Sequence, residues 1–387
     1  MLKLIKNADI YAPERRGTGH LLVGGGRILY LGSELPNVDA ALLSETLDVQ
    51  GAALVPGLID CHVHLTGGGG EDGFSTQAPA LPLSQFTLHG VTSVVGLLGT
   101  DDETRSTANL LARTRALREE GLSAWCWTGG YHVPPTTLTG SVRRDIVNID
   151  CIIGLGELAI SDHRSSQPSF DELARLASEV HVGGMLSRKA GVVHLHLGDG
   201  SRGLSLLRTI LDETELPARV FHPTHVNRNK ALFDEACALS HRNVVIDVTA
   251  FPVEEGEDAW SAPDAWEQYH ERACPPEGLT ISSDGGGCLP VFNDQGEMLS
   301  MSFASSAGLP ESLRELLLRG HGLEQVLPAM TSNVASLLKL ERKGRLEAGA
   351  DADLLCLDDD HKVQHVMARG QWMVQDKTPL VRGLFDD

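Results

Sequence analysis

The sequence predicts an α/β protein built on a TIM (β/α)8 barrel, with a small discontinuous β-sandwich domain made from both chain ends. Apolar, β-rich runs alternate with helical stretches through the middle of the chain, the pattern of successive βα units. Eight such runs can be counted, and eight parallel strands close a TIM barrel. We therefore expect the barrel in residues 56–344 and the small β domain in residues 1–55 and 345–387.

The two chain ends share a pattern of short apolar bursts broken by glycines, which is typical of β-hairpins. The N-terminal example is LLVGGGRILYLG (Leu21–Gly32), and the C-terminal one is DADLLCLDDDHKVQHVMARGQWMV. Neither end carries a long helical period, so we expect them to fold together. A chain that stayed soluble and active after truncation near residue 345 would contradict a shared domain.

The runs expected to form the barrel strands are, in chain order, LVPGLIDCHVHL, VTSVVGLLG, SAWCWTGGY, CIIGLGELAI, VVHLHLG, RVFHPTHV, NVVIDVTAF and LTISSDGG. Helices fit between them. The stretch from Thr104 to Gly121 ends on a glycine, a common helix stop, and SFDELARLASEV opens with a Ser-Phe-Asp-Glu N-cap pattern.

The composition indicates a globular protein of negative charge. Of the 387 residues, 42% are hydrophobic and 22% charged, and 32 basic against 52 acidic residues give a net charge of -20. Such a surface repels phosphate backbones and anionic membranes, so we expect neither nucleic acid nor membrane as a partner. If the substrate is anionic, a few arginines must reverse this field inside the site.

The cysteines and the N-terminal segment predict a cytoplasmic location. The seven cysteines are odd in number and include no CxxC pair, which suits a reducing compartment. The segment MLKLIKNADIYAPERR lacks the apolar core of a signal peptide, and no run approaches about 18 apolar residues.

Polar side chains recur at the ends of the predicted strands, where TIM-barrel active sites lie. His62 and His64 end the first run, and strand residues i and i+2 point to the same face, as two ligands of one ion must. The later runs contribute, in order, Thr100, Tyr131, Glu157, His196, His225 and Asp284. His194 repeats the spacing beside His196, and spacing alone leaves open which of the two is a ligand.

Imidazoles and carboxylates together suit Zn²⁺, with Mn²⁺ or Co²⁺ as alternatives. Four histidines and two carboxylates exceed the needs of one ion, so the pattern favours two divalent metal ions, with zinc the expected metal. Asp284 precedes a glycine-rich turn that would let a substrate come close.

Several motifs resemble a known family. PGLIDCHVHL resembles the metal-binding opening of the amidohydrolase superfamily, and GRLEAGADADLLCLD resembles the closing segment of its small β domain. HVHLTGGGGEDG, GVTSVVGLLGTD, TGGYHVPPTTLTGSV, AISDHRSS, PTHVNRN and ISSDGGG, in this order, are similar to the isoaspartyl dipeptidase family, whose members cleave β-aspartyl dipeptides. The similarity runs through most of the chain.

The resemblance implies roles for individual residues. It implies His62, His64 and Asp284 on one metal ion and His196 and His225 on the other. It implies a dipeptide pocket in which Glu71 holds the α-amino group, Thr100, Arg164 and Arg228 bind carboxylates, and Tyr131 stabilises the oxyanion. In the implied reaction, a hydroxide that bridges the metals attacks the β-aspartyl amide, while Asp284 takes its proton and returns it to the leaving amine.

Two positions depart from the family pattern. Glu157 stands where the family usually carries a carboxylated lysine that bridges the metals, and we expect its shorter carboxylate to bridge them instead. Cys288 stands in place of a serine that contacts a substrate carboxylate, and a thiol is a weaker donor. We interpret Cys288 as pocket wall and not as a nucleophile.

Other functions stay open at this point. One is another amidohydrolase reaction, on N-acyl amino acids or cyclic amides. A second is a non-catalytic barrel relative, although retention of all four histidines and Asp284 argues against it. The resemblance also implies a homo-oligomer, and no readable motif defines the pocket for the leaving residue.

Overall fold

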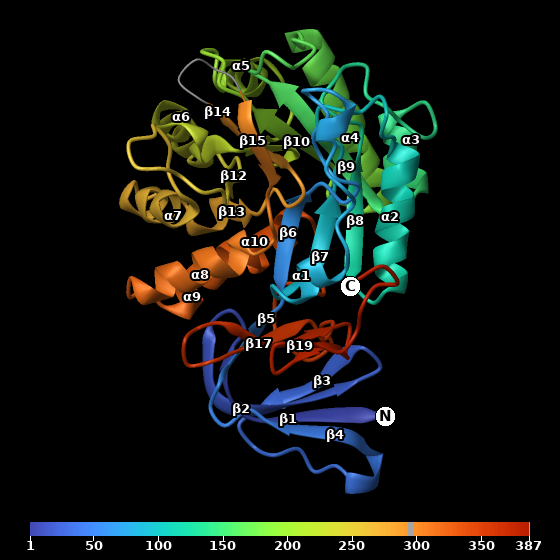
Figure 1. The fold of residues 1–387 in the computed structure, drawn as a ribbon, viewed down its shortest axis with the longest axis vertical. Coiled ribbons are helices and arrows are strands. Elements are labelled where there is room, and N and C mark those ends of the chain that lie inside the picture. The colour runs from blue at the N-terminus through green and yellow to red at the C-terminus, as the bar shows by residue number, and fades with distance from the viewer. Residues whose placement is uncertain (293–297, 387) are drawn as a thin grey trace.

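The structure, a computed structural model, describes residues 1–292 and 298–386. Its larger part is a parallel barrel enclosed by helices (Figure 1). Six strands form one ladder in the order β11-β10-β9-β8-β7-β6, and β12 and β13 form a parallel pair. A bridge from Val63 to Gly285 joins β6 to the segment after β13.

All eight predicted barrel strands are present, which confirms the TIM-barrel prediction. They are β6 (Leu58–Val63), β7 (Val91–Gly96), β8 (Ser123–Thr128), β9 (Ile152–Ile160), β10 (Val192–Leu197), β11 (Phe221–Thr224), β12 (Ile246–Thr249) and β13 (Leu279–Ser282). Every residue of β6, β7, β9 and β10 is buried, as expected for parallel strands covered on both faces.

Helices lie between the strands, and α2 and α4 fall on the two helical stretches that the sequence analysis named. They are α1 (Ser84–Thr87), α2 (Thr107–Glu119), α3 (Val142–Asn148), α4 (Phe170–Ser187), α5 (Ser205–Glu213), α6 (Lys230–Ser240) and α7 (Ala262–Glu271), followed by α8 (Gly308–Leu318), α9 (Leu323–Val326) and α10 (Ser332–Leu337). Ser169 and Glu172 cap each other's backbone at the start of α4, which confirms the predicted N-cap pattern.

Both chain ends contribute to one nine-stranded sheet, which lies below the barrel in Figure 1. Its strands are β1 (Leu2–Tyr11), β2 (Arg15–Gly24), β3 (Arg27–Gly32), β4 (Leu43–Asp48), β5 (Ala53–Pro56), β16 (Leu354–Leu357), β17 (Val363–Ala368), β18 (Gln371–Gln375) and β19 (Thr378–Pro379). Antiparallel pairing of β5 with β16 joins the two ends, and the predicted hairpins β2–β3 and β16–β17 are present.

Strand β16 shows how this sheet meets the barrel. Leu355 and Leu357 pack into the barrel core, whereas Leu354 and Cys356 pack into a second core with residues of β1 and β2. Successive strand residues point to opposite faces, so one strand serves both cores. That residues 1–55 and 345–387 form a distinct domain with these boundaries stays a prediction.

A hairpin that the sequence did not predict follows the barrel. Strands β14 (Cys288–Phe292) and β15 (Met298–Phe303) pair antiparallel. Strand β14 begins at Cys288, shortly after Asp284 in the sequence. In the described part of the chain, no helix is long and apolar enough to cross a membrane.

Candidate metal centre and substrate pocket

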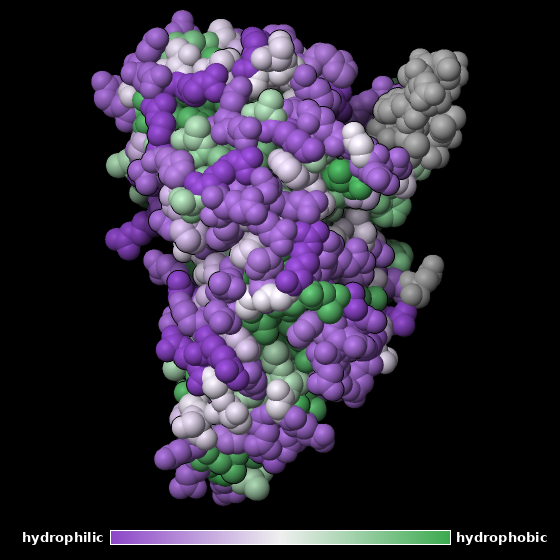
Figure 2. All heavy atoms as spheres, turned by 90° about the vertical axis from the view of Figure 1, so that its left-hand side faces the viewer, coloured by the Kyte–Doolittle hydropathy of each residue, from purple (hydrophilic) through white to green (hydrophobic). Residues whose placement is uncertain are grey.

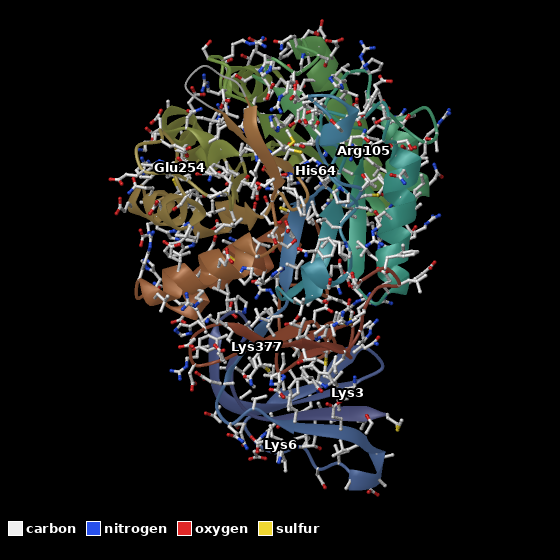
Figure 3. All side chains as sticks on the ribbon, in the orientation of Figure 1. Lys3, Lys6, His64, Arg105, Glu254 and Lys377 are labelled. Carbon is white, nitrogen blue, oxygen red and sulfur yellow. The ribbon has the colours of Figure 1, made fainter. Side chains whose placement is uncertain are left out.

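The predicted site residues come together at one cavity of about 80 Å³ at the carboxyl ends of the barrel strands. Every one of them except His62 lines it: His64, Glu71, Thr100, Tyr131, Glu157, Arg164, His196, His225, Arg228, Asp284 and Cys288. The His62 side chain is fully buried and does not line the cavity. His64 lies in the barrel, whereas Lys3, Lys6 and Lys377 mark the sheet of the chain ends (Figure 3).

Two carboxylates connect the histidines. The Nε2 atoms of His62 and His64 lie 3.2 and 3.1 Å from Asp284 Oδ1. Glu157 Oε1 lies 2.6 Å from His196 Nδ1 and 3.0 Å from His225 Nε2. The other oxygen of Glu157, Oε2, lies 3.7 and 3.9 Å from Nε2 of His62 and His64. The Glu157 carboxylate therefore sits between the two histidine pairs.

The donor atoms fit divalent cations. Four buried atoms of this cluster have no hydrogen-bond partner among the described residues: His62 Nε2, His64 Nδ1, Glu157 Oε2 and Asp284 Oδ1. Buried polar atoms are rarely left unpaired, and a cation would satisfy them. Two triads, His62–His64–Asp284 and His62–Glu157–His225, each bring one ligand atom per residue within 4.8 Å of the others.

Two of these residues adopt a backbone conformation that side chains disfavour. Asp284 has φ 54° and His225 has φ 59°, both in the left-handed region. Each costs about 1–2 kcal/mol relative to the right-handed conformation. Such residues cluster at functional sites, because there the direction of the side chain matters more than the local strain.

The charges in the cluster oppose the effect of burial. Burial by itself would raise the pKa values of Asp284 and Glu157, but the neighbouring histidines, above all His62, hold both well below their usual range. Burial would lower the pKa of His62, yet Glu157 and Asp284 raise it to about 9. Both carboxylates are therefore ionised. A cation that binds here replaces a proton on the cluster.

The two histidines of β10 lie at different depths relative to the cavity, and His196 is in neither of the two triads. His196 lines the cavity and contacts Glu157, as described above. His194 lies behind His62, with Nε2 2.8 Å from His62 Nδ1. His196 is therefore the candidate ligand of the pair.

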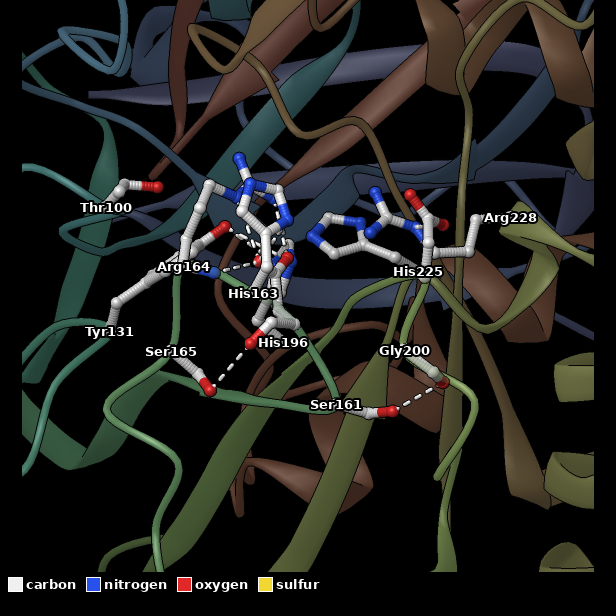
Figure 4. A network of polar contacts seen from close by, with 12 residues as sticks. Thr100, Tyr131, Ser161, His163, Arg164, Ser165, His196, Gly200, His225 and Arg228 are labelled. Carbon is white, nitrogen blue, oxygen red and sulfur yellow. Dashed lines mark hydrogen bonds and ion pairs between the residues drawn. The ribbon is translucent and has the colours of Figure 1, made fainter.

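The substrate side of the cavity carries Glu71, Thr100 and Arg164. Thr100 donates a hydrogen bond of 3.1 Å to Glu71 Oε1, and Arg164 Nη1 lies 3.4 Å from the same oxygen. The Tyr131 hydroxyl lies 2.8 Å from His196 Nδ1, and the Arg164 guanidinium lies 5.6 Å from the centre of the Tyr131 ring. Figure 4 shows Tyr131, Arg164 and His196 converging on one point, with His225 and Arg228 opposite.

The two arginines differ in their existing contacts. Arg164 donates from Nε and Nη2 to Asp162, at 3.0 and 2.7 Å. Arg228 Nε is buried and has no hydrogen-bond partner in the described residues, and its ion pair with the exposed Asp199 is 3.8 Å long. Arg228 is therefore the arginine that is better placed to receive a carboxylate.

Sequence reasoning missed Asp162 and His132. Asp162 also contacts His196 Nε2 at 2.9 Å, so that it fixes both His196 and Arg164. His132 bridges Asp102, at 2.7 Å, and the Arg164 carbonyl, at 3.2 Å, and thereby ties the Tyr131 loop to the Arg164 loop. The only sequence signal was proximity, since Asp162 lies two residues before Arg164 and His132 follows Tyr131.

The glycine run after His64 lets the loop fold closely around the cavity. Gly67 and Gly69 have φ of 80° and 78°, where only glycine is readily accommodated. A Cβ atom at Gly67 would overlap the Ala78 carbonyl, and one at Gly69 would overlap the Cys288 sulfur. The glycines thus place Glu71 at the cavity rim.

Cys288 is a half-buried thiol in the cavity wall. Burial, together with the charges of Glu71 and Asp284, raises its pKa to about 11. The thiol therefore stays protonated at neutral pH, and only the thiolate is a strong nucleophile.

No family model matches the chain, but known structures do. The β-aspartyl dipeptidase of the thermophile Fervidobacterium islandicum AW-1, solved in complex with a β-Asp-Leu dipeptide, is 40% identical to it. The alignment covers 98% of each chain, with a TM-score of 0.90. The chain belongs to the β-aspartyl dipeptidase family. This confirms the resemblance seen in the motifs.

The chain is also similar to more distant proteins. An allantoinase of Deinococcus radiodurans is 25% identical over 90% of this chain and 85% of its own. An imidazolonepropionase of Acidiphilium cryptum is 31% identical, but the match spans 36% of this chain and 37% of that relative. A dihydropyrimidinase of Brevibacillus agri, 18% identical with a TM-score of 0.68 and 97% covered, shares the fold.

Proposed function

We propose that this chain is a metal-dependent dipeptidase that hydrolyses the β-aspartyl peptide bond. The observation that carries the proposal is the shared cavity. Glu71, Thr100, Arg164 and Arg228, which can bind an ammonium group and carboxylates, face the same space as three of the histidines, His64, His196 and His225. A β-aspartyl dipeptide presents all of these groups around one amide bond.

In this proposal His62, His64 and Asp284 would hold one divalent cation, and His196 and His225 the other, with Glu157 between them. Zn²⁺ fits the donors, and such ions polarise an amide carbonyl and make water a nucleophile at neutral pH. Glu157 would be shared between the two ions, because each of its two oxygens faces one histidine pair.

The chain's own residues would orient the substrate. Glu71 would accept hydrogen bonds from the α-ammonium group, and Arg228 would bind a carboxylate through its unpaired Nε. Charge-assisted hydrogen bonds of this kind fix position as well as affinity. Thr100 and Arg164 already contact Glu71 and would hold it in place.

Tyr131 and Asp284 have the protonation states that their proposed roles at the reacting amide require. Burial, followed by the charge of Glu157, raises the pKa of Tyr131 well above its ordinary value, so its hydroxyl keeps its proton and can donate to the developing oxyanion. Asp284 is ionised and lies at the cavity wall, where it can accept a proton from the attacking water and return it to the leaving nitrogen.

The test is hydrolysis of β-Asp-Leu beside α-Asp-Leu, an N-acetyl amino acid and a hydantoin by zinc-loaded protein. Cleavage confined to β-Asp-Leu supports the proposal. Cleavage of the N-acetyl or cyclic substrate, with β-Asp-Leu untouched, would assign the chain to a different amidohydrolase reaction, since those substrates offer Glu71 no free amine. A cytoplasmic location and a homo-oligomer stay predictions, as does the expectation of no nucleic-acid or membrane partner.

A further inference from the structure

A line of five hydrogen-bonded side chains leads from His62 away from the cavity into the barrel. His62 Nδ1 lies 2.8 Å from His194 Nε2, and His194 Nδ1 lies 2.9 Å from His222 Nδ1. His222 Nε2 lies 2.9 Å from Thr280 Oγ1, which donates a 2.6 Å bond to Asp247 Oδ1. All five side chains are fully buried, and each comes from a different barrel strand.

The direction of these bonds can be assigned from the Asp247 end. A carboxylate only accepts, and Asp247 also accepts from Thr224 at 2.7 Å and from Ser282 at 2.5 Å. Thr280 has a single O–H, and its other acceptor neighbour is the Ile246 carbonyl at 3.3 Å. Whichever acceptor it uses, Thr280 must accept its bond from His222, so the His222 proton is on Nε2.

The proton on His222 Nε2 determines which nitrogens of the next two histidines are protonated. Each N···N contact needs one proton between two nitrogens. His222 Nδ1 is then bare and accepts from His194 Nδ1–H, which leaves His194 Nε2 bare to accept from His62 Nδ1–H. His62 Nδ1 therefore holds a proton, and the nitrogen that can exchange its proton for a cation is Nε2, the atom that lies 3.2 Å from Asp284 and 3.7 Å from Glu157. Nε2 is also the nitrogen that lacks a hydrogen-bond partner among the described residues.

We propose that Asp247, Thr280, His222 and His194 form a positioning relay that fixes the tautomer of His62 and presents Nε2 as a metal ligand. The proposal rests on the metal centre of the proposed function. A partner on the second imidazole nitrogen sets the orientation of a ligating histidine and strengthens it as a donor. Trp127 stacks on His194, 5.3 Å between ring centres and 10° between planes, and keeps the middle of the relay in place.

A third metal site is the competing explanation of this cluster. Cys61, His222 and Asp247 bring ligand atoms within 4.8 Å of one another. However, both nitrogens of His222 already bond within the relay, and the Cys61 thiol lies 3.6 Å from Asp247 Oδ1.

The test is the zinc affinity of Thr280→Val, a substitution that keeps the shape but removes the hydroxyl. Thr224→Val is the matched control, because Thr224 also donates to Asp247, whereas the side-chain hydrogen bonds described for His194 and His222 do not involve it. We expect Thr280→Val to weaken zinc binding about 10- to 100-fold in competition with a chelator. Thr280→Ser should restore the affinity, and Thr224→Val should leave it nearly unchanged.

Nitrogen NMR of the zinc-loaded protein gives a second measurement that needs no variant. The relay requires protons on Nδ1 of His62, on Nδ1 of His194 and on Nε2 of His222. The relay would be contradicted by a wild-type zinc affinity in Thr280→Val or by a proton on His222 Nδ1. Three zinc ions per chain would also contradict it, because the third ion would occupy the relay residues. The two experiments measure zinc affinity and the positions of histidine protons, and neither depends on hydrolysis. A protein that does not cleave β-Asp-Leu therefore contradicts the proposed function without contradicting the relay.

Discussion

At the scale of single residues, the sequence predicted which side chains share the cavity, but not how each is held. Motif positions and strand ends were sufficient to select Glu71, Tyr131 and Arg228. They could not choose between His194 and His196, since residues i and i+2 share a face and differ only in depth within the barrel. Asp162 was missed because an aspartate beside an arginine in a loop is more often a turn former than a partner of a metal ligand.

Glu157→Gln tests the bridging carboxylate. The amide keeps the shape but removes the negative charge between the histidine pairs, so we expect bound zinc to fall below two ions per chain. Activity should fall by at least about 10- to 100-fold, as for changes around a metal ligand. Metal analysis and β-Asp-Leu turnover measure both, with Glu119→Gln on the exposed end of α2 as control. Full metal content in Glu157→Gln would contradict the role.

Arg228→Ala tests carboxylate binding. A hydrogen bond to a charged group contributes about 1.5–3 kcal/mol, so kcat/KM should fall roughly 10- to 150-fold, mainly through KM. Arg242→Ala is the control, because Arg242 forms a surface ion pair with Asp212, 2.7 Å long. An unchanged KM in Arg228→Ala would mean that another group binds the carboxylate.

At the scale of secondary structure, the apolar runs predicted every barrel strand, because parallel strands covered on both faces must be continuously apolar. The hairpin β14–β15 was not predicted. Its first strand contains Pro290, and a proline inside a run argues against a strand. The sequence predicted that the two chain ends fold together but not that β5 pairs with β16, because local patterns do not say which of two distant strands are neighbours.

The capping box of α4 gives a stability prediction at this scale. Ser169→Ala removes the side chain that accepts from the Glu172 backbone, so the free energy of unfolding should fall by about 0.5–2 kcal/mol. Urea unfolding measures this, and Ser169→Asp should retain most of the stability because aspartate also caps. Since the helix start is away from the cavity, turnover of β-Asp-Leu should not change. An undiminished unfolding free energy in Ser169→Ala would contradict the prediction.

At the scale of the whole molecule, charge governs how substrates approach. The net charge is -20, and the face shown in Figure 2 is mostly hydrophilic. A second cavity, of about 760 Å³, shares His225, Arg228, Asp284 and Cys288 with the first. Beyond them it is lined by Phe251 and Leu289 and by four acidic residues, Asp199, Glu254, Glu257 and Asp258. We expect the leaving residue to occupy this space, because it adjoins the cavity that holds the metal-centre residues.

This acidic wall predicts a preference among leaving residues. We expect β-Asp-Lys to be cleaved with a higher kcat/KM than β-Asp-Glu, by roughly two- to fivefold, the scale of exposed ion pairs. The difference should shrink in high salt and in a Glu254→Gln, Glu257→Gln double variant. Faster cleavage of β-Asp-Glu would place the leaving residue elsewhere.

The most direct test of the account is stepwise reconstitution of the chelated protein with zinc, while leucine release from β-Asp-Leu is followed. We expect no activity without metal and a rise that levels off at two zinc ions per chain. A plateau at one ion would contradict the paired site around Glu157. Protein that holds two ions and still leaves β-Asp-Leu intact would contradict the proposed function itself.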